Sequence, residues 1–205
     1  MQSTFPPPDR QPQALEAMFA ARKQVFVDLL GWSLPIVDGR FEIDRFDDGA
    51  AEYLILIDTH GRHRASARLL RTAAPHLLGE LYPHLCDGPI PSGPSVREIT
   101  RFCLDRDQSA AQRRSARNQL ITALVEHALD AGITDYVGVA DLAWYSQILG
   151  FGWRCLPLGR ARRDGPMTLA ALHIEIDDAT LPKLRRGHVF EPVTLSLVHA
   201  GGAAQ

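Results

Sequence analysis

Two clusters of charged residues are the places in this sequence where chemistry could be done. The first covers residues 42–48, EIDRFDD, which are acidic with one aromatic residue inside the run. The second covers residues 97–102, REITRF, where charges alternate with apolar residues in a segment that reads as a strand. Arg68, flanked by Ala67 and Leu69, is a third charge in an apolar setting.

Charged groups inside a fold are costly unless they are paired. Several paired charges at one end of a sheet would form a polar pocket, which suits a small molecule. The candidates for such a pocket are Asp44, Asp47, Arg68, Glu98 and Arg101. Two plainer interpretations stay open: residues 42–48 as a solvated loop, and residues 97–102 as an edge strand whose charges face solvent.

Most other chemical signatures are absent from the sequence. It contains no GxxxxGK[ST], no GxGxxG after a strand, no HExxH and no GxSxG. The three cysteines have no CxxC spacing, which indicates reduced thiols in a cytoplasmic protein and neither a disulfide scaffold nor a zinc site. The eight histidines are scattered, so we expect no metal site.

Composition excludes several classes of protein. A chain of 205 residues that is 45% apolar is long enough for one domain with a sizeable core. Its net charge of −2 argues against nucleic-acid binding by bulk charge. No apolar run approaches the ~20 residues of a membrane span, and the first residues lack the basic start and apolar stretch of a secretory signal.

Apolar periodicity predicts the elements that must position the charged clusters. Helices are expected over residues 13–30, 75–85, 109–131 and 142–149, with a final short helix after Asp177. Strands are expected over residues 53–57, 64–71, 95–104, 136–140 and 169–176, the first two forming a hairpin, while residues 31–50 read as a long, partly ordered loop. The pattern is typical of an α/β fold, a single domain with a mixed central sheet flanked by helices. We expect a flexible N-terminal segment over residues 1–12, the domain over residues 13–190 and a frayed tail over residues 191–205.

The order and spacing of these residues resembles the LuxI-type acyl-homoserine-lactone synthases, the autoinducer synthases that make quorum-sensing signals. The resemblance runs from about Phe19 to Ile176, which is most of the chain. Its motifs read Arg22-x-x-x-Phe26, Gly31-Trp32, Glu42-x-Asp44-x-x-Asp47, Tyr53-Leu54, Ala67-Arg68-Leu69-Leu70-x-Thr72, Pro75-x-Leu77-Leu78 and Glu98-x-Thr100-Arg101-Phe102.

The sequence departs from the family pattern at a few positions. Tyr82 stands where the family usually has Phe, and Thr100 stands where Ser is common. Gly138 and Ala140 occupy a strand where many makers of 3-oxo chains carry Thr. The loss of that hydroxyl argues against a 3-oxo acyl group, and the small side chains suggest room in an acyl pocket.

The resemblance implies a fold similar to the N-acetyltransferase (GNAT-like) superfamily and the activity of an acyltransferase. S-adenosylmethionine would be the amino donor and a substrate, so no cofactor is expected. An acyl-carrier protein or acyl-CoA would supply the acyl group as a thioester. The amine attacks the thioester carbonyl, and the carboxylate then displaces the sulfonium, which closes the lactone and releases methylthioadenosine.

Several residues of the motifs suit this chemistry. Glu98 is the candidate general base that deprotonates the amine, helped if partial burial raises its pKa towards neutrality. Arg22 or Arg101 could hold the carboxylate bidentately. Phe26 and Trp32 could wall the adenine and face the sulfonium. The residues expected at the S-adenosylmethionine site are Arg22, Phe26, Trp32, Asp44, Asp47 and Arg101, with Glu98, Arg101 and Asp44 as the catalytic set.

The acyl donor needs hydrogen-bond donors for its carbonyl oxygen and a slot for its tail. Backbone N–H groups around Phe102 and Cys103 are the expected donors. The residues expected on the acyl side are Thr100, Phe102, Cys103, Val139, Leu142 and Trp144. Arg68 and Tyr82 are expected to give structural support, Arg68 by ordering the acidic cluster.

The segment Arg113-Arg-Ser-Ala-Arg117 lacks the glycine-rich turn of ordinary acetyl-CoA acetyltransferases, since no Gly occurs between Gly93 and Gly132. Its three Arg suit an acidic acyl-carrier protein, the phosphates of an acyl-CoA, or simply a solvated helix start. Two further alternatives stay open. One is an N-acyltransferase of the same fold acting on another amine, and the other is a non-catalytic relative that binds a ligand or partner.

Overall fold

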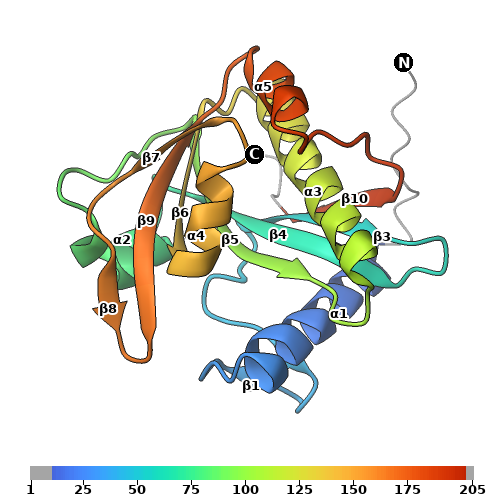
Figure 1. The fold of residues 1–205 in the computed structure, drawn as a ribbon. Coiled ribbons are helices and arrows are strands. Elements are labelled where there is room, and N and C mark those ends of the chain that lie inside the picture. Colours follow the sequence, from blue (N-terminus) through green and yellow to red (C-terminus); the bar gives the residue numbers. More distant parts are fainter. Residues whose placement is uncertain (1–10, 202–205) are drawn as a thin grey trace. The chain divides into compact units, whose positions relative to one another are not determined.

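The computed structural model describes residues 11–201, which form two compact units. Of the described residues, unit 1 comprises 11–68, 101–120 and 191–201, and unit 2 comprises 69–100 and 121–190. Three elements contribute residues to both units, namely β4 (His63–Arg71), β5 (Val96–Leu104) and α3 (Ala110–Ala131). Figure 1 shows the labelled elements along the chain.

Unit 1 begins with α1 (Gln11–Arg22), which continues as the π-helical turn η2 (Lys23–Leu29). The buried face of α1 carries Ala14, Met18, Ala21 and Arg22, a spacing close to the helical repeat. The segment ends before Gly31, whose φ of 69° is the left-handed conformation that glycine adopts readily. The helix predicted over residues 13–30 is therefore confirmed, with a π-helical end that periodicity did not reveal.

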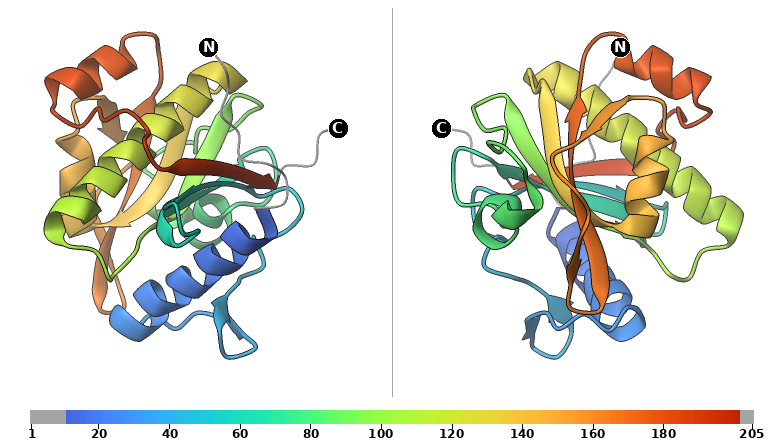
Figure 2. Two further views of the ribbon diagram at one scale, coloured as in Figure 1. Left: turned by 90° about the vertical axis from the view of Figure 1, so that its right-hand side faces the viewer. Right: turned by 60° about the vertical axis from the view of Figure 1, so that its left-hand side comes forward.

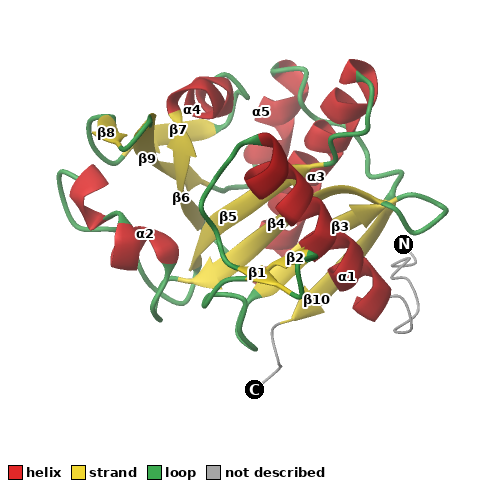
Figure 3. Ribbon diagram, turned by 90° about the horizontal axis from the view of Figure 1, so that it is seen from below, coloured by secondary structure: helices red, strands yellow, loops and turns green. Residues whose placement is uncertain are grey.

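The strands of unit 1 lie in the order β10-β3-β4-β5, with β3 (Glu52–Ile57) internal. Five of the six β3 side chains are buried, as expected for a strand with partners on both edges. The small pair β1 (Ile36–Val37) and β2 (Phe41–Glu42) lies within the predicted loop and is antiparallel. Figure 3 shows α1 lying across the strands of this unit.

Unit 2 contains the mixed part of the sheet. Strand β5 pairs in parallel with β6 (Asp135–Asp141), which pairs antiparallel with β9 (Met167–Glu175). Strands β7 (Arg154–Pro157) and β8 (Arg162–Asp164) both pair antiparallel with β9. The helical elements of this unit, apart from the end of α3, are α2 (Leu77–Leu81), η3 (Pro83–Leu85), α4 (Leu142–Leu149) and α5 (Thr180–Arg186). Figure 2 shows α4 beside β6 and β9, with which it makes contact.

The buried core of unit 2 joins the helical elements to the sheet. Leu78 from α2 and Leu85 from η3 pack with Val96, Val137 and Leu169 from three strands. At the end of β6, Asp141 caps α4 because its side chain accepts hydrogen bonds from the backbone N–H groups of the first turn. The core therefore fixes both α2 and the strand that carries Glu98.

The predicted class, α/β with a mixed sheet and helices, is confirmed, and two local expectations are wrong. Residues Ser196–Gly201 form β10, paired along their whole length with β3, so this part of the expected tail is not frayed. Gln11 and Pro12 belong to α1, because proline is compatible with the first turn of a helix. The segment after α4 contains β7 and β8, which were not predicted. The rest of the two terminal expectations, residues 1–10 and 202–205, lies outside the described residues, and the domain boundary over residues 13–190 stays a prediction.

No helix within residues 11–201 combines the length and the apolar character that crossing a membrane requires.

Candidate active site

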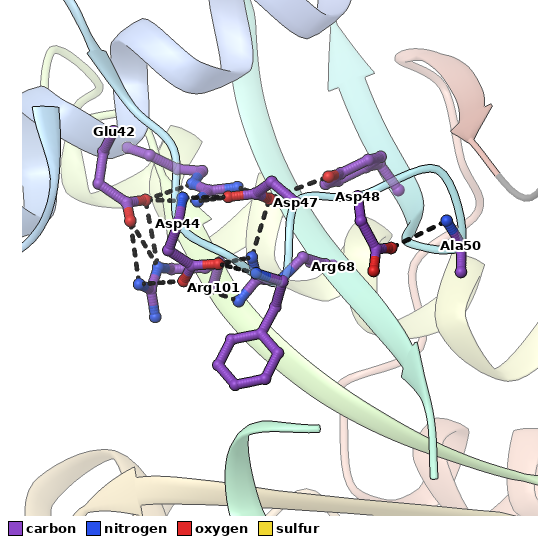
Figure 4. Close-up of polar contacts among 10 residues, drawn as sticks. Glu42, Asp44, Asp47, Asp48, Ala50, Arg68 and Arg101 are labelled. Atoms are coloured by element: carbon purple, nitrogen blue, oxygen red, sulfur yellow. Dashed lines mark hydrogen bonds and ion pairs between the residues drawn. The ribbon is translucent and has the colours of Figure 1, made fainter. Parts of the chain in front are cut away.

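Three arginines and three carboxylates of unit 1 form one network of ion pairs (Figure 4). The members are Arg22, Arg68, Arg101, Glu42, Asp44 and Asp47. Their formal charges cancel, so this group can be buried without an uncompensated charge. The side chains of Glu42 and Asp47 are 0% exposed, so the interpretation of residues 42–48 as a solvated loop is wrong.

Asp47 lies at the centre of the network. Its Oδ1 accepts hydrogen bonds from Arg22 Nη1 at 2.8 Å and from the Tyr53 hydroxyl at 2.9 Å. Its Oδ2 accepts from Arg22 Nη2 at 2.7 Å and from the Asp44 backbone N–H at 2.8 Å. Burial opposes ionisation of this carboxyl, but Arg22 and Arg68 outweigh it and hold the pKa of Asp47 well below its ordinary value.

The guanidinium group of Arg22, like the carboxylate of Asp47, is buried and hydrogen-bonded within the network. Its Nε donates to Glu42 at 2.6 Å, its two terminal nitrogens donate to Asp47, and the side chain is 0% exposed. Burial alone would lower the pKa of Arg22, yet the hydrogen bonds and attraction of Asp47 and Glu42 raise it above its ordinary value. Direct contact of Arg22 or Asp47 with a substrate stays a prediction that this geometry does not favour, because both groups are already saturated by the protein.

Asp44 and Arg101 form the accessible edge of the network, with side chains 10% and 8% exposed. Asp44 accepts from both terminal nitrogens of Arg68, at 2.6 and 3.1 Å, and from Arg101 Nη2 at 2.7 Å. Arg101 also reaches Glu42 through Nε and Nη2. Within residues 11–201, its Nη1 makes no hydrogen bond, so one guanidinium N–H edge remains to bind a further anion.

The backbone at Arg101 differs from that of a regular strand. Its φ is 49°, in the left-handed region that costs free energy for a residue with a side chain. Buried side chains alternate through residues 96, 98 and 100, and the next buried position is 103. The alternation predicted from the sequence therefore shifts by one residue at this point. Since β5 has β4 on one edge and β6 on the other, the interpretation of residues 97–102 as an edge strand is wrong.

Two aromatic rings lie next to Arg101. The rings of Phe26 and Trp32 are stacked, with centroids 5.0 Å apart and an angle of 13° between their planes. The guanidinium carbon of Arg101 lies 5.8 Å from the centroid of Phe26. Phe26 is buried with Ala21, Val25 and Cys103, while Trp32 packs on this group and stays half-buried. The two rings thus form a stacked pair in unit 1, beside the accessible arginine, and their contact with an adenine stays a prediction.

In unit 2, Glu98 is completely buried and accepts a hydrogen bond from the backbone N–H of Leu78 at 2.8 Å. Thr100 is also buried, two residues further along β5. Tyr82, at the end of α2, packs against the buried cluster around Leu78. Glu98 and Arg101 are three residues apart in one strand, and the strand contributes one to each unit.

The residues expected on the acyl side differ in their exposure. Val139 packs against the unit 2 core, Trp144 is half-buried with its ring edge on Phe151, and Leu142 is 47% exposed. Gly138 offers less space than its size suggests: a Cβ there would lie 3.0 Å from the carbonyl oxygen of Ile99. The missing side chain serves the close approach of β5 to β6, and room for an acyl chain near this strand stays a prediction.

The start of α3 carries the predicted run of arginines in unit 1. Ser109 and Gln112 form a reciprocal cap, in which each side chain accepts a hydrogen bond from the other's backbone N–H. Burial, together with repulsion from Arg114, lowers the pKa of Arg117. Arg113 and Arg114 make no ion pair within residues 11–201. Arg113 and Arg114 therefore present positive charge that no ion pair within residues 11–201 compensates.

Cys103 gives a direct test of burial in unit 1. Its side chain is 0% exposed, and burial raises the pKa of its thiol to about 12. Because the thiolate is the reactive form, we expect Cys103 to resist iodoacetamide at pH 8 in the folded protein and to react fully in urea. Mass spectrometry of the labelled peptides measures this. Labelling of native Cys103 at the rate of the half-buried Cys86 would contradict the packing.

Two members of the site were not singled out from the sequence. Glu42 bonds both Arg22 and Arg101, and Tyr53 donates to Asp47. Glu42 was visible as the first acidic residue of the cluster and Tyr53 as the first apolar residue of the next strand, but neither pattern indicates which partner a side chain meets. Only the fold brings residues 20 to 60 positions apart into one network.

Comparison with known proteins now identifies the family. The family described as Autoinducer synthase matches residues 9–184. The acyl-homoserine-lactone synthase of Rhizobium etli is 35% identical over 176 residues, covering 84% of this chain and 81% of that protein. The solved structure of BjaI, a CoA-dependent acyl-homoserine lactone synthase with SAM and isopentyl-CoA, superimposes with a TM-score of 0.78 at 28% identity, covering 89% of this chain and 87% of that one.

A more distant structure extends the likeness of the fold. An acyl-CoA N-acyltransferase from Pseudomonas aeruginosa has a TM-score of 0.51 at 15% identity, covering 78% of this chain and 90% of that one. This agrees with the expected GNAT-like architecture. The chain belongs to the autoinducer synthase family, the acyltransferases that make acyl-homoserine lactones.

Proposed function

We propose that this chain makes an acyl-homoserine lactone in which S-adenosylmethionine supplies the amine and an acyl thioester supplies the acyl group. The amine forms an amide bond with the thioester carbonyl carbon as the thiol leaves. The carboxylate of the same S-adenosylmethionine then attacks its γ-carbon, and the sulfonium leaves as methylthioadenosine. The observation that carries this proposal is the accessible edge of the ion-pair network, where Asp44 and Arg101 lie beside the Phe26–Trp32 stack.

Each part of that edge matches one part of S-adenosylmethionine. The Nη1 of Arg101 is suited to the carboxylate, because a guanidinium N–H forms a charge-assisted hydrogen bond with it. Asp44 is suited to the ammonium and the sulfonium, which are both positive. Phe26 and Trp32 offer ring faces to the adenine and to the sulfonium. In this proposal Arg22 and Asp47 do not touch substrate but hold Glu42, Asp44 and Arg101 in place.

Glu98 is proposed as the general base that takes a proton from the amine, directly or through a water molecule. The amine must be neutral before its lone pair can attack the thioester. A buried carboxylate held by the Leu78 N–H keeps a fixed orientation, which suits proton transfer at a defined atom. Backbone N–H groups near Phe102 and Cys103 remain the proposed donors to the thioester oxygen.

Arg113, Arg114 and Arg117 are proposed to receive the phosphate of the acyl donor. Both candidate donors share this chemistry, because phosphopantetheine on an acyl-carrier protein and coenzyme A each carry phosphate. Guanidinium groups bind phosphate well, and the unpaired Arg113 and Arg114 leave positive charge at the start of α3. Contacts between these arginines and phosphate are expected with either donor, so they do not indicate which donor the protein uses.

Trp32→Ala tests the adenine and sulfonium contacts. The substitution removes one ring of the stack, and a cation–π contact contributes roughly 0.5–2 kcal/mol, so the KM for S-adenosylmethionine should rise about 2- to 30-fold. The KM for the acyl donor should stay close to that of the parent protein. Initial rates with each substrate varied in turn measure both constants. A change confined to the acyl donor would refute the assignment of Trp32.

The proposed reaction is tested with purified protein, S-adenosylmethionine and matched acyl-CoA and acyl-carrier-protein donors. We expect release of methylthioadenosine together with a product whose mass spectrum contains the homoserine-lactone fragment. The donor that supports the higher kcat/KM identifies the donor class, and the product mass gives the acyl chain. Acyl transfer to another amine without methylthioadenosine release would instead support an N-acyltransferase. If folded protein forms no product with any of these donors, the proposal is overturned.

A further inference from the structure

His76 is a buried histidine in unit 2 that the proposed reaction does not use. Its side chain is 8% exposed, and its Nδ1 lies 2.9 Å from the carbonyl oxygen of Ala74. A carbonyl oxygen only accepts hydrogen bonds, so Nδ1 donates to it. Nε2 has no hydrogen-bond partner among residues 11–201. The ring is therefore placed by one hydrogen bond and by packing.

Gly79, inside α2, provides the surface on which this ring packs. A Cβ added to Gly79 would lie 2.7 Å from Cε1 and 3.0 Å from Nε2 of His76. The imidazole thus fills the space that a side chain at position 79 would need. Because glycine is a poor helix former, this contact gives a physical reason for glycine within so short a helix.

The helix that His76 precedes presents its first turn to Glu98. The carbonyl of His76 accepts the backbone N–H of Glu80 at 2.9 Å, which is the first hydrogen bond of α2. The N–H groups of a first turn have no partner within the helix, and that of Leu78 donates to Glu98 Oε1 at 2.8 Å. The Leu78 side chain is 0% exposed in the unit 2 core, so the backbone of this first turn joins the core to Glu98.

We propose that His76 is a positioning residue for Glu98, whose ring packs on Gly79 and fixes the first turn of α2 so that the Leu78 N–H stays on the carboxylate. This inference rests on the proposed role of Glu98 as the base. His76 touches no reacting atom and acts through the backbone of residues 76–78. A hydrogen bond to a carboxylate favours its charged form, so the contact keeps Glu98 able to accept a proton at lower pH.

The first experiment compares pH profiles of kcat/KM for His76→Ala, His76→Gln and the parent protein. In His76→Ala the hydrogen bond from the Leu78 N–H to Glu98 should weaken. The acid limb of the profile, where kcat/KM falls at low pH, should then move to higher pH by roughly half a unit to one unit. Gln can donate from its amide to Ala74 and should restore most of the original profile. His84→Ala removes an exposed histidine next to α2 and is the matched control. An unmoved limb in His76→Ala would overturn the inference.

The second experiment uses the contact between His76 and Gly79. Gly79→Ala in the parent protein forces its Cβ against the imidazole and should shift the limb as His76→Ala does. In the His76→Ala background the ring is gone, so Gly79→Ala should have no further effect. Independent, additive shifts from the two substitutions would contradict the proposed packing.

Amide exchange at Leu78 separates the two proposals. We expect its N–H to exchange faster with solvent in His76→Ala than in the parent protein, whatever Glu98 does in the reaction. If that exchange rises while Glu98→Gln keeps full turnover, the role of Glu98 fails and the positioning of α2 stands. If Glu98→Gln is inactive and the Leu78 exchange is unchanged, the inference about His76 fails alone.

Discussion

Glu98→Gln should lower kcat by about 10²- to 10⁴-fold, the usual contribution of a general base. The amide has nearly the volume of the carboxylate, and its oxygen can still accept the Leu78 N–H. The proton acceptor is therefore lost with little change in packing. The KM for S-adenosylmethionine should change little, because the proposed binding groups Asp44, Arg101 and Trp32 are untouched. Steady-state rates of methylthioadenosine release measure both constants.

The control for this substitution is Glu80→Gln, which makes the same chemical change on the exposed side of α2. It should leave kcat at the parent value. A Glu98→Gln protein with parental kcat would remove Glu98 from the mechanism. A selective increase in KM would show that Glu98 binds substrate and does not transfer a proton.

Arg22→Ala should destabilise the protein by about 3–5 kcal/mol, the cost of leaving buried carboxylates without their partner. The substitution removes the cation that both Glu42 and Asp47 bond, and neither of them is exposed to water. Urea unfolding followed by circular dichroism measures the free energy of unfolding. Arg40→Ala is the control, since its ion pair with Glu16 is 68% and 56% exposed, and it should cost no more than about 0.5 kcal/mol.

The same network gives the protein a pH dependence of known sign. The pKa of Asp47 is lower in the folded protein than its ordinary 3.8, so the folded state favours its charged form. This stabilisation is fully present above about pH 5 and is lost as the pH falls below about 4 towards the folded pKa. The stability of Arg22→Ala should therefore decline less steeply between pH 5 and pH 3 than that of the parent protein. Equal slopes would show that Arg22 does not maintain the low pKa of Asp47.

The sequence predicted most of the elements and every member of the network except Glu42. Helical spacing placed Arg22 within a helix predicted over residues 13–30, and the apolar run around Tyr53 predicted the strand that follows the acidic cluster. Family spacing brought Glu98, Arg101 and the acidic cluster into one hypothesis. The predicted helices and strands depend on residues close together in the chain, where periodicity is informative.

The sequence could not show which side chains are saturated by their neighbours. Arg22 and Arg101 were equal candidates for a substrate carboxylate, and only the structure shows Arg22 enclosed and Arg101 with a remaining N–H edge. The one-residue shift in the burial pattern of β5 at Arg101 depends on a positive φ angle, which the residue types in this strand do not predict. The close approach of the Ile99 carbonyl to Gly138 is likewise visible only in the structure. Each of these depends on contacts between distant segments, which periodicity does not record.

The π-helical turn after Arg22 has a consequence for the register of the whole N-terminal helix. A π-turn is equivalent to one extra residue inserted into an α-helix, and one residue corresponds to about 100° of rotation about the helix axis. The π-helical turn begins directly after Arg22, which anchors the ion pairs, and it contains Phe26, so the number of residues in the turn sets the angle between these two side chains. A deletion of one residue from Lys23–Leu29 would let the segment wind as a regular α-helix and turn Phe26 away from Trp32.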